Sequence, residues 1–212
     1  MLLLLLLLAS AGPALAQTPP RPPIGPPVVA SPNGAIVVTI GTEGRLTWSV
    51  THRGRAILQP SPIALRLGDG RVLGEKPLLT TSFTRSIDTT LKPVVRYRRA
   101  EVRDRFNEAV FAFAGNYALV VRAYDDGVAY RWKTMLPGEI TVAGEDVVYF
   151  PEEESLQSHQ ERLYKKLKIS EITPGRFSSL PAMVQLPGGV KAVLTESDLF
   201  DYPGMDLTAG GT

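Results

Sequence analysis

Short runs of alternating apolar and polar residues, separated by glycine-containing turns, dominate the chain from residue 33 onward. Asp-Gly and Gly-x-Gly between aliphatic runs tolerate positive φ and indicate hairpins. Strands are expected at residues 35–40, 45–51, 55–58, 63–67 and 71–73. Strands at this spacing, with turn signals between them, predict an all-β, antiparallel sandwich.

The clearest hairpin comprises residues 117–124 and 128–134, joined by Asp125-Asp126-Gly127. Both faces of its first arm are largely apolar, which predicts a central strand covered on two sides. A further pair, 182–186 and 190–195, is joined by Pro-Gly-Gly. No segment has a sustained helical period, and residues 152–166 are the place where one short helix is expected.

The N-terminus has the pattern of a secretory signal. Leu2 to Leu8 form an apolar run, and Ala14-Leu15-Ala16 provides a small-x-small cleavage site, so residues 1–16 are interpreted as a signal peptide. An uncleaved anchor is the alternative, because no Lys or Arg precedes the run. The run is shorter than the roughly 20 apolar residues that span a bilayer. We therefore expect no membrane span in the mature chain.

Residues 17–32 are expected to be a Pro-rich linker, since they hold seven of the 18 prolines and such segments favour extended conformations. Residues 33–212 remain for one domain. The chain has no cysteine, so an exported form has no disulfides, which favours a secreted or periplasmic location in a bacterial envelope.

Charge and composition exclude several classes of function. The 23 basic and 21 acidic residues nearly cancel, so neither nucleic acid nor an anionic membrane is expected as a partner. The two histidines lie in no zinc or Ser-His-Asp pattern, and His52 is expected to be solvated in a turn. The basic run at residues 96–105 predicts a solvent-facing strand with cross-strand ion pairs.

Acidic residues near the C-terminus carry the main chemical signal. Glu196 and Asp198 follow the last predicted strand, just before the turn at Pro203-Gly204. Carboxylates at a strand end can project into a cleft, although such residues commonly face water. The pattern alone leaves both interpretations open.

Three segments together resemble the N-terminal domain of glycoside hydrolase family 97. They are Val193-Leu194-Thr195-Glu196-Ser197-Asp198-Leu199 with Asp201-Tyr202-Pro203-Gly204-Met205, Ser31-Pro32-Asn33-Gly34, and the hairpin from Val121 to Arg131. The family comprises bacterial α-glucosidases and α-galactosidases. The resemblance implies a galactose-mutarotase-like β-super-sandwich at residues 33–212, packed against a catalytic (β/α)8 barrel that is absent from this chain.

The resemblance also implies a Ca²⁺ ion at the domain boundary, for which Glu196 would be the metal ligand contributed by this chain. Ser197 stands where the resemblance suggests a small residue such as alanine, a departure that should leave the carboxylate unaffected. No catalytic residue is assigned here, and Asp198, Asp201 and Asp206 are not considered substitutes. We expect an isolated chain that is inactive, with an α-linked oligosaccharide or glycoside as substrate of the whole enzyme.

Two further expectations concern surfaces. The face that bears Leu199, Phe200 and Tyr202 should expose an apolar patch, because it would meet the barrel. The segment around Glu161 and Tyr164 corresponds, by resemblance, to the barrel mouth. The alternative function is a stand-alone carbohydrate-binding module of the envelope, in which tryptophans or tyrosines would stack on sugars. A structural envelope protein without a ligand is the third hypothesis.

Overall fold

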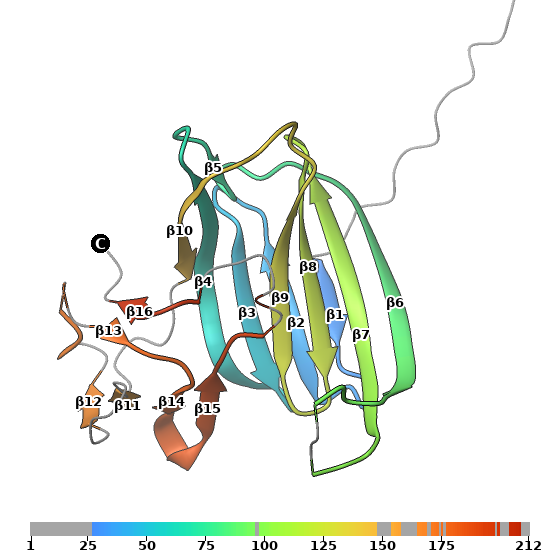
Figure 1. Cartoon of the computed structure of the whole chain (residues 1–212), viewed down its shortest axis with the longest axis vertical. Coiled ribbons are helices and arrows are strands. Elements are labelled where there is room, and N and C mark those ends of the chain that lie inside the picture. The colour runs from blue at the N-terminus through green and yellow to red at the C-terminus, as the bar shows by residue number, and fades with distance from the viewer. Residues whose placement is uncertain are drawn as a thin grey trace, which may run out of the picture.

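The computed structural model describes residues 27–95, 98–147, 154–157, 165–168, 171–173, 175, 177–197, 199 and 204–208. Two antiparallel sheets lie face to face, with a smaller four-stranded sheet and one strand pair beside them (Figure 1). The prediction of an all-β antiparallel sandwich is therefore confirmed. Within the described ranges, no helix has the length and apolar character needed to cross a membrane.

The first sheet has the order β1-β2-β3-β4-β10, and β5 pairs with β4. Its strands are β1 (Val28–Ala30), β2 (Ile36–Gly41), β3 (Thr47–His52), β4 (Arg55–Leu67), β5 (Val72–Leu73) and β10 (Val142–Val147). The alternation predicted from sequence is clearest in β2, where Ile36, Val38 and Ile40 are buried and the residues between them are half-buried. Such a period-2 pattern places every second side chain on the core face.

The second sheet has the order β6-β7-β8-β9. Its strands are β6 (Leu79–Leu91), β7 (Val102–Phe113), β8 (Tyr117–Tyr124) and β9 (Val128–Thr134). The bounds of β8 and β9 are those predicted for the clearest hairpin. The expectation for β8 is also confirmed, because it lies between β7 and β9 and is buried along most of its length.

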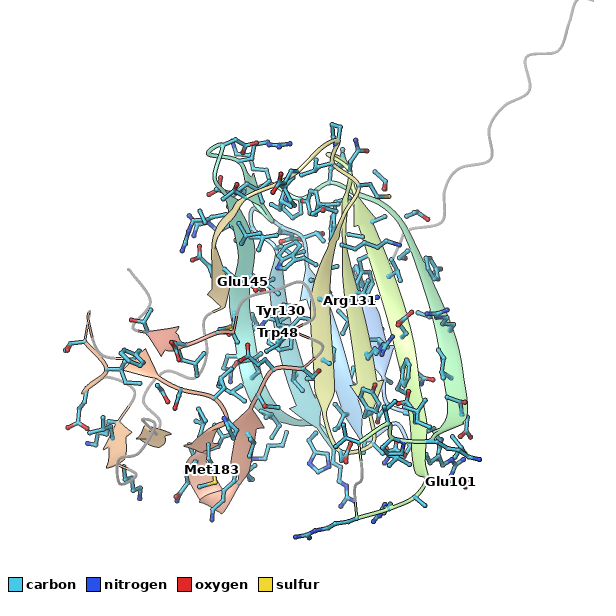
Figure 2. All side chains as sticks on the ribbon, viewed as in Figure 1. Trp48, Glu101, Tyr130, Arg131, Glu145 and Met183 are labelled. Carbon is cyan, nitrogen blue, oxygen red and sulfur yellow. The ribbon has the colours of Figure 1, made fainter. Side chains whose placement is uncertain are left out.

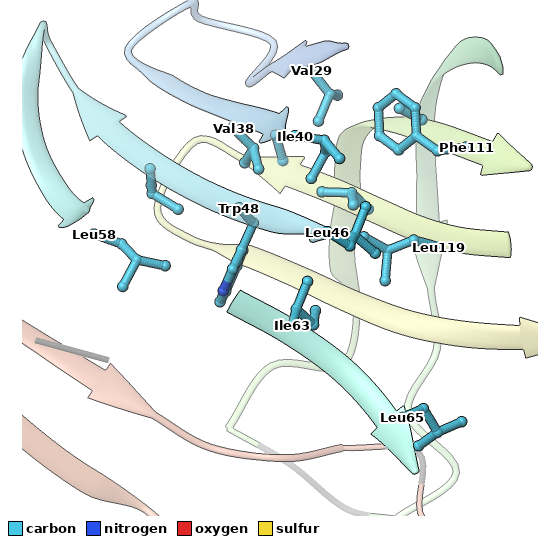
Figure 3. Packing of buried hydrophobic residues seen from close by; sticks show 14 of the residues in the cluster. Val29, Val38, Ile40, Leu46, Trp48, Leu58, Ile63, Leu65, Phe111 and Leu119 are labelled. Carbon is cyan, nitrogen blue, oxygen red and sulfur yellow. The ribbon is translucent and has the colours of Figure 1, made fainter. Parts of the chain in front are cut away.

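The main hydrophobic core fills the space between these two sheets (Figure 3). Fully buried side chains come from both layers, with Val38 and Ile40 on β2 and Phe111, Leu119 and Val121 on β7 and β8. Burial of large aliphatic and aromatic side chains stabilises each by about 1.5–3 kcal/mol. The absence of disulfides is thus compatible with a stable fold.

The remaining strands form a smaller region beside the sandwich (Figure 1). They are β11 (Glu154–Gln157), β12 (Lys165–Lys168), β14 (Ala182–Gln185) and β15 (Lys191–Leu194) in one sheet, with β13 (Phe177–Ser178) paired to β16 (Leu207–Thr208). The turn between β14 and β15 is the 3₁₀ segment η2 (Pro187–Gly189).

Several expectations differ from the structure. Residues 55–58 and 63–67, expected as separate strands, are parts of the single strand β4. The short helix expected at residues 152–166 is wrong, because β11 lies inside that range and pairs with β12 and β14. Cross-strand pairing overrides the weak local preference of this charged segment. The expected linker also ends earlier than residue 32, because β1 pairs with β2 and buries Val29 in the core.

Candidate functional site

The β14–β15 hairpin positions Glu196. Val184 and Leu186 belong to the sandwich core, and Val190, Ala192 and Leu194 pack against it. Arg55 on β4 donates a hydrogen bond to the carbonyl of Pro187 at the hairpin turn. The hairpin is therefore fixed to the sandwich at its turn and along one face.

Glu196 continues the core-facing row of β15. Ala192, Leu194 and Glu196 are half-buried, whereas Val193, Thr195 and Ser197 are exposed. Because successive side chains of an extended segment point to opposite faces, this alternation places the Glu196 carboxylate on the same side as Leu194.

One oxygen of Glu196 has a fixed partner. The backbone N–H of Met205 donates to Glu196 Oε2 at 2.8 Å, across nine positions of sequence. The second oxygen, Oε1, lies 3.5 Å from where a Cβ on Gly204 would stand. The carboxylate therefore joins the end of the β15 segment to the chain that leads into β16. Any side chain at position 204 would contact the acid.

The chemistry of Glu196 fits one part of a calcium site. Calcium prefers carboxylate and other hard oxygen ligands and takes six to eight of them. Glu196 offers Oε1, and Oε2 retains a lone pair beside the Met205 bond. Within the described ranges, no three His, Asp or Glu side chains are grouped to hold a metal ion. Glu196 alone can supply only part of such a coordination shell.

The other residues singled out near this segment are only partly described. Asp206 and Ser197 are exposed. Leu199 is 40% exposed, as expected for the apolar patch, but Phe200 and Tyr202 lie outside the described residues. Asp198, Asp201, Glu161 and Tyr164 lie outside them as well.

A second carboxylate, which the sequence pattern did not reveal, lies between the two sheets (Figure 2). Glu145 on β10 accepts hydrogen bonds at Oε1 from Tyr130 Oη at 2.7 Å and Trp132 Nε1 at 3.0 Å. Burial raises the pKa of the Glu145 carboxyl group, and the two hydrogen bonds only partly offset that effect. Glu145 belongs to no sequence motif; only the packing of β9 near β10 brings these side chains together.

The tryptophans considered for a sugar-binding platform pack against other side chains of the sandwich; Trp48 is buried, and Trp132 is half-buried, as is Tyr130 beside them. Trp48 is only 6% exposed and meets the Tyr130 ring edge-on at a centroid distance of 5.1 Å. Trp132 packs against the core and donates its N–H to Glu145. A stacking platform needs exposed, coplanar rings. The geometry of these three residues therefore does not support a stand-alone binding module.

The strand expected over the basic run begins only at Val102, because the described residues 98–101 lie outside any strand. The two arginines of the run that lie on β7 form the expected ion pairs. Arg103 on β7 pairs with Asp88 on β6 at 2.6 Å, and Arg105 approaches Asp125 at 3.6 Å. These pairs are exposed, so they contribute little stability. His52 ends β3 with an exposed side chain, in agreement with a solvated histidine.

Comparison with known proteins agrees with the resemblance found in the sequence. The family described as Glycosyl-hydrolase 97 N-terminal matches residues 29–212. A retaining alpha-galactosidase of Bacteroides thetaiotaomicron is 34% identical over 85% of this chain and 30% of its own length. A probable retaining alpha-galactosidase of Streptomyces bingchenggensis is 30% identical over 88% of this chain and 30% of its own length.

Solved structures show the same fold. A glycoside hydrolase family 97 enzyme from Pseudoalteromonas sp. strain K8, in complex with acarbose, superposes with a TM-score of 0.77 at 19% identity, over 86% of this chain and 30% of that one. A beta-arabinopyranosidase superposes with a TM-score of 0.70 at 20% identity, over 81% of this chain and 31% of that one. The chain thus spans about a third of the length of these relatives. It belongs to the N-terminal domain family of glycoside hydrolase family 97.

Proposed function

We propose that this chain is the N-terminal domain of an exported, calcium-dependent α-galactosidase of the retaining type. The observation that carries the proposal is the family match over residues 29–212, together with two relatives named as retaining alpha-galactosidases at 34% and 30% identity. The structure bound to acarbose is only 19% identical, so it informs the fold and not the choice of sugar. These names favour an α-galactoside over an α-glucoside as substrate.

In this proposal the sandwich supplies a ligand and part of a carbohydrate-binding cleft, and the chemistry takes place elsewhere. Retaining glycosidases place two carboxyl groups about 5–5.5 Å apart on either side of the scissile bond. We assign no such pair to this chain. Glu145 is engaged by Tyr130 and Trp132 inside the sandwich, and Glu108 by Arg85 and Arg122 on the second sheet.

Glu196 would hold calcium through Oε1 while Met205 continues to donate to Oε2. Calcium bound there would supply Lewis acidity or a template for the substrate. The hydrogen bond from Met205 orients the carboxylate before the metal arrives, which reduces the ordering cost of binding. The hairpin anchored by Leu186 and Leu194 would keep this ligand at a fixed place relative to the sandwich.

Export rests on the leader predicted at residues 1–16, and we propose a periplasmic or secreted location for the whole enzyme. Expression of the natural gene with and without this leader, followed by fractionation of the cells, tests the point. Retention of both forms in the cytoplasm would contradict it.

The calcium role is tested with Glu196→Gln in the polypeptide encoded by the complete reading frame. Glu139→Gln is the matched control, because Glu139 is an exposed glutamate in the loop between β9 and β10. Hydrolysis of a nitrophenyl α-galactoside and the calcium-induced rise in melting temperature are measured for each variant. We expect Glu196→Gln to weaken both calcium responses and Glu139→Gln to leave them unchanged. An unaltered calcium response in Glu196→Gln would overturn the assignment of this ligand.

A further inference from the structure

The edges of the two sheets meet through side chains at β9 and β10. β9 is the last strand of the second sheet, and β10 is the last strand of the first, so no backbone ladder joins them in the described part of the chain. Tyr130 on β9 lies beside Glu145 on β10 (Figure 2) and donates a hydrogen bond to it. Trp132, two positions further along β9, donates a second hydrogen bond to the same acid. The hydrogen bonds to Glu145 therefore join two edges that otherwise meet through apolar packing, to which Val142 on β10 contributes.

Both donors bind the same carboxylate oxygen. Tyr130 Oη and Trp132 Nε1 lie 2.7 Å and 3.0 Å from Glu145 Oε1. Trp48 on β3 meets the Tyr130 ring edge-on, and Tyr117 on β8 lies 6.0 Å from the Trp132 ring. Aromatic side chains from β3 and β8 thus pack against the two donors of β9, and Glu145 itself is half-buried beside them.

No described cation compensates a charge on Glu145. The charged group that acts on it is Asp146, a like charge, which itself pairs with Arg66 on β4. Arg131 and Lys133 alternate with the two aromatic residues of β9 and are exposed on the opposite face. On β4, the register partner of Glu145 is Leu65.

Because of these contacts, the stability of the folded chain differs between the neutral and the ionised form of Glu145. An ionised carboxylate accepts the two hydrogen bonds more strongly, but its charge is half-buried with no compensating cation among the described residues. Burial outweighs the hydrogen bonds, so the pKa of Glu145 is raised above its ordinary value of 4.5. Since the folded pKa exceeds the unfolded one, the stabilisation is complete at low pH and is lost as the pH rises through the folded pKa.

We propose that Glu145 is a proton-controlled clasp between β9 and β10, which holds this edge of the sandwich closed while its carboxyl group is neutral and loosens it on ionisation. Separation of β10 admits water to the charge and so relieves the cost of its burial. The clasp is a property of this chain alone and does not depend on the proposed hydrolase function.

Tryptophan fluorescence reports directly on the clasp, because both tryptophans of the chain, Trp48 and Trp132, belong to it. In the 212-residue chain we expect the emission to titrate with a midpoint above 4.5, the ordinary glutamate value. Glu145→Gln should abolish this transition. Asp146→Asn is the matched control; it should retain the transition at a lower midpoint, since Asp146 raises the pKa of Glu145. A transition that persists in Glu145→Gln, or a wild-type midpoint at or below 4.5, would overturn the proposal.

Tyr130→Phe provides a second test that does not require the Glu145 variant to fold. The Tyr130 hydroxyl favours the charged carboxylate, so its removal should move the midpoint upward, and an unmoved or lowered midpoint contradicts the clasp. Hydrogen exchange of the β10 amides measures the opening itself. After correction for intrinsic exchange, protection should fall about tenfold for each unit by which the pKa is raised. Protection that is independent of pH would also overturn the proposal.

Discussion

Glu196 and Met205 are joined by a hydrogen bond of 2.8 Å from the backbone N–H of Met205 to the Glu196 carboxylate. The acid identified from the family resemblance therefore has a structural role in this chain before any metal is considered. The bond brings the segment after β15 to the segment before β16, and among the described residues no donor binds Oε1. A structural role and a ligand role are compatible, since they use different oxygens.

The first prediction concerns this bond. Glu196→Ala removes the acceptor for the Met205 N–H and should lower the free energy of unfolding of the chain by about 1 kcal/mol. Glu196→Gln keeps an acceptor oxygen and should lower the free energy of unfolding by less than Glu196→Ala does. Urea unfolding measures both, with Ser197→Ala as an exposed neighbouring control. Equal effects of Glu196→Ala and Ser197→Ala would contradict the structural role of the bond.

The second prediction concerns Glu108, whose side chain is only 4% exposed and binds two arginines. Arg122 Nε donates to Oε2 and Arg85 Nε to Oε1, each at 2.8 Å. Glu108→Ala leaves both guanidinium groups without their acceptor and opens a gap in the sheet. We expect a loss of about 2 kcal/mol, less than for a fully buried pair because Arg85 reaches solvent.

The same carboxylate should make stability depend on acid. Burial raises the pKa of Glu108, but the hydrogen bonds from Arg122 and Arg85 outweigh it and leave the pKa below its ordinary value. Its stabilising contribution is therefore present above the unfolded pKa and lost as the pH falls through the folded pKa. Melting curves across the acid range should show a steeper loss for the wild type than for Glu108→Gln. Parallel curves would be inconsistent with this coupling.

The third prediction concerns Gly74, whose φ is +100° and whose absent Cβ would lie 2.6 Å from the carbonyl oxygen of Ile63. An unhindered Gly→Ala change at positive φ is expected to destabilise a fold by about 1 kcal/mol. Gly74→Ala should destabilise this fold several times more, because backbone atoms must move to make room for the Cβ. Gly70→Ala is the control, since Gly70 also has a positive φ of +89° but a Cβ there meets nothing within 4 Å. Thermal melting compares the two, and similar melting temperatures would argue against the close approach.

The fourth prediction concerns the packing between the sheets. Leu119 on β8 is fully buried, so Leu119→Ala should lower the free energy of unfolding by about 2–5 kcal/mol. Leu78 is 67% exposed, and Leu78→Ala should change it by less than about 0.5 kcal/mol. Chemical unfolding distinguishes the two variants. A small effect at Leu119 would show that the core does not lie between these sheets.

The sequence predicted those strands that are marked by alternation and turn residues within a single segment. The hairpin of β8 and β9 follows from alternation around Asp-Asp-Gly, and its bounds agree with the structure. β1 was not expected, because the prolines around Val28–Ala30 are typical of a linker. The strand forms because these residues pair with β2. The helix expected at residues 152–166 failed for a related reason, since β11 is stabilised by distant partners.

Glu196 and Glu145 differ in the same way, since one is marked by neighbouring residues in sequence and the other is not. Glu196 was found because a run of neighbouring residues resembles a family motif, and its bond to Met205 could not be inferred from that run. Glu145 carries no motif, and its partners Tyr130 and Trp132 become visible only when β9 and β10 are placed in space. Contacts between sheets depend on the fold as a whole, and periodicity along one strand does not encode them.

The most direct test of the account is to read the coding sequence beyond the codon for Thr212. If this chain is the N-terminal domain of a family 97 hydrolase, the frame should continue for several hundred codons, with alternating strand and helix patterns typical of a (β/α)8 barrel. A stop codon directly after Thr212 would contradict the proposal that a catalytic domain completes the calcium site around Glu196.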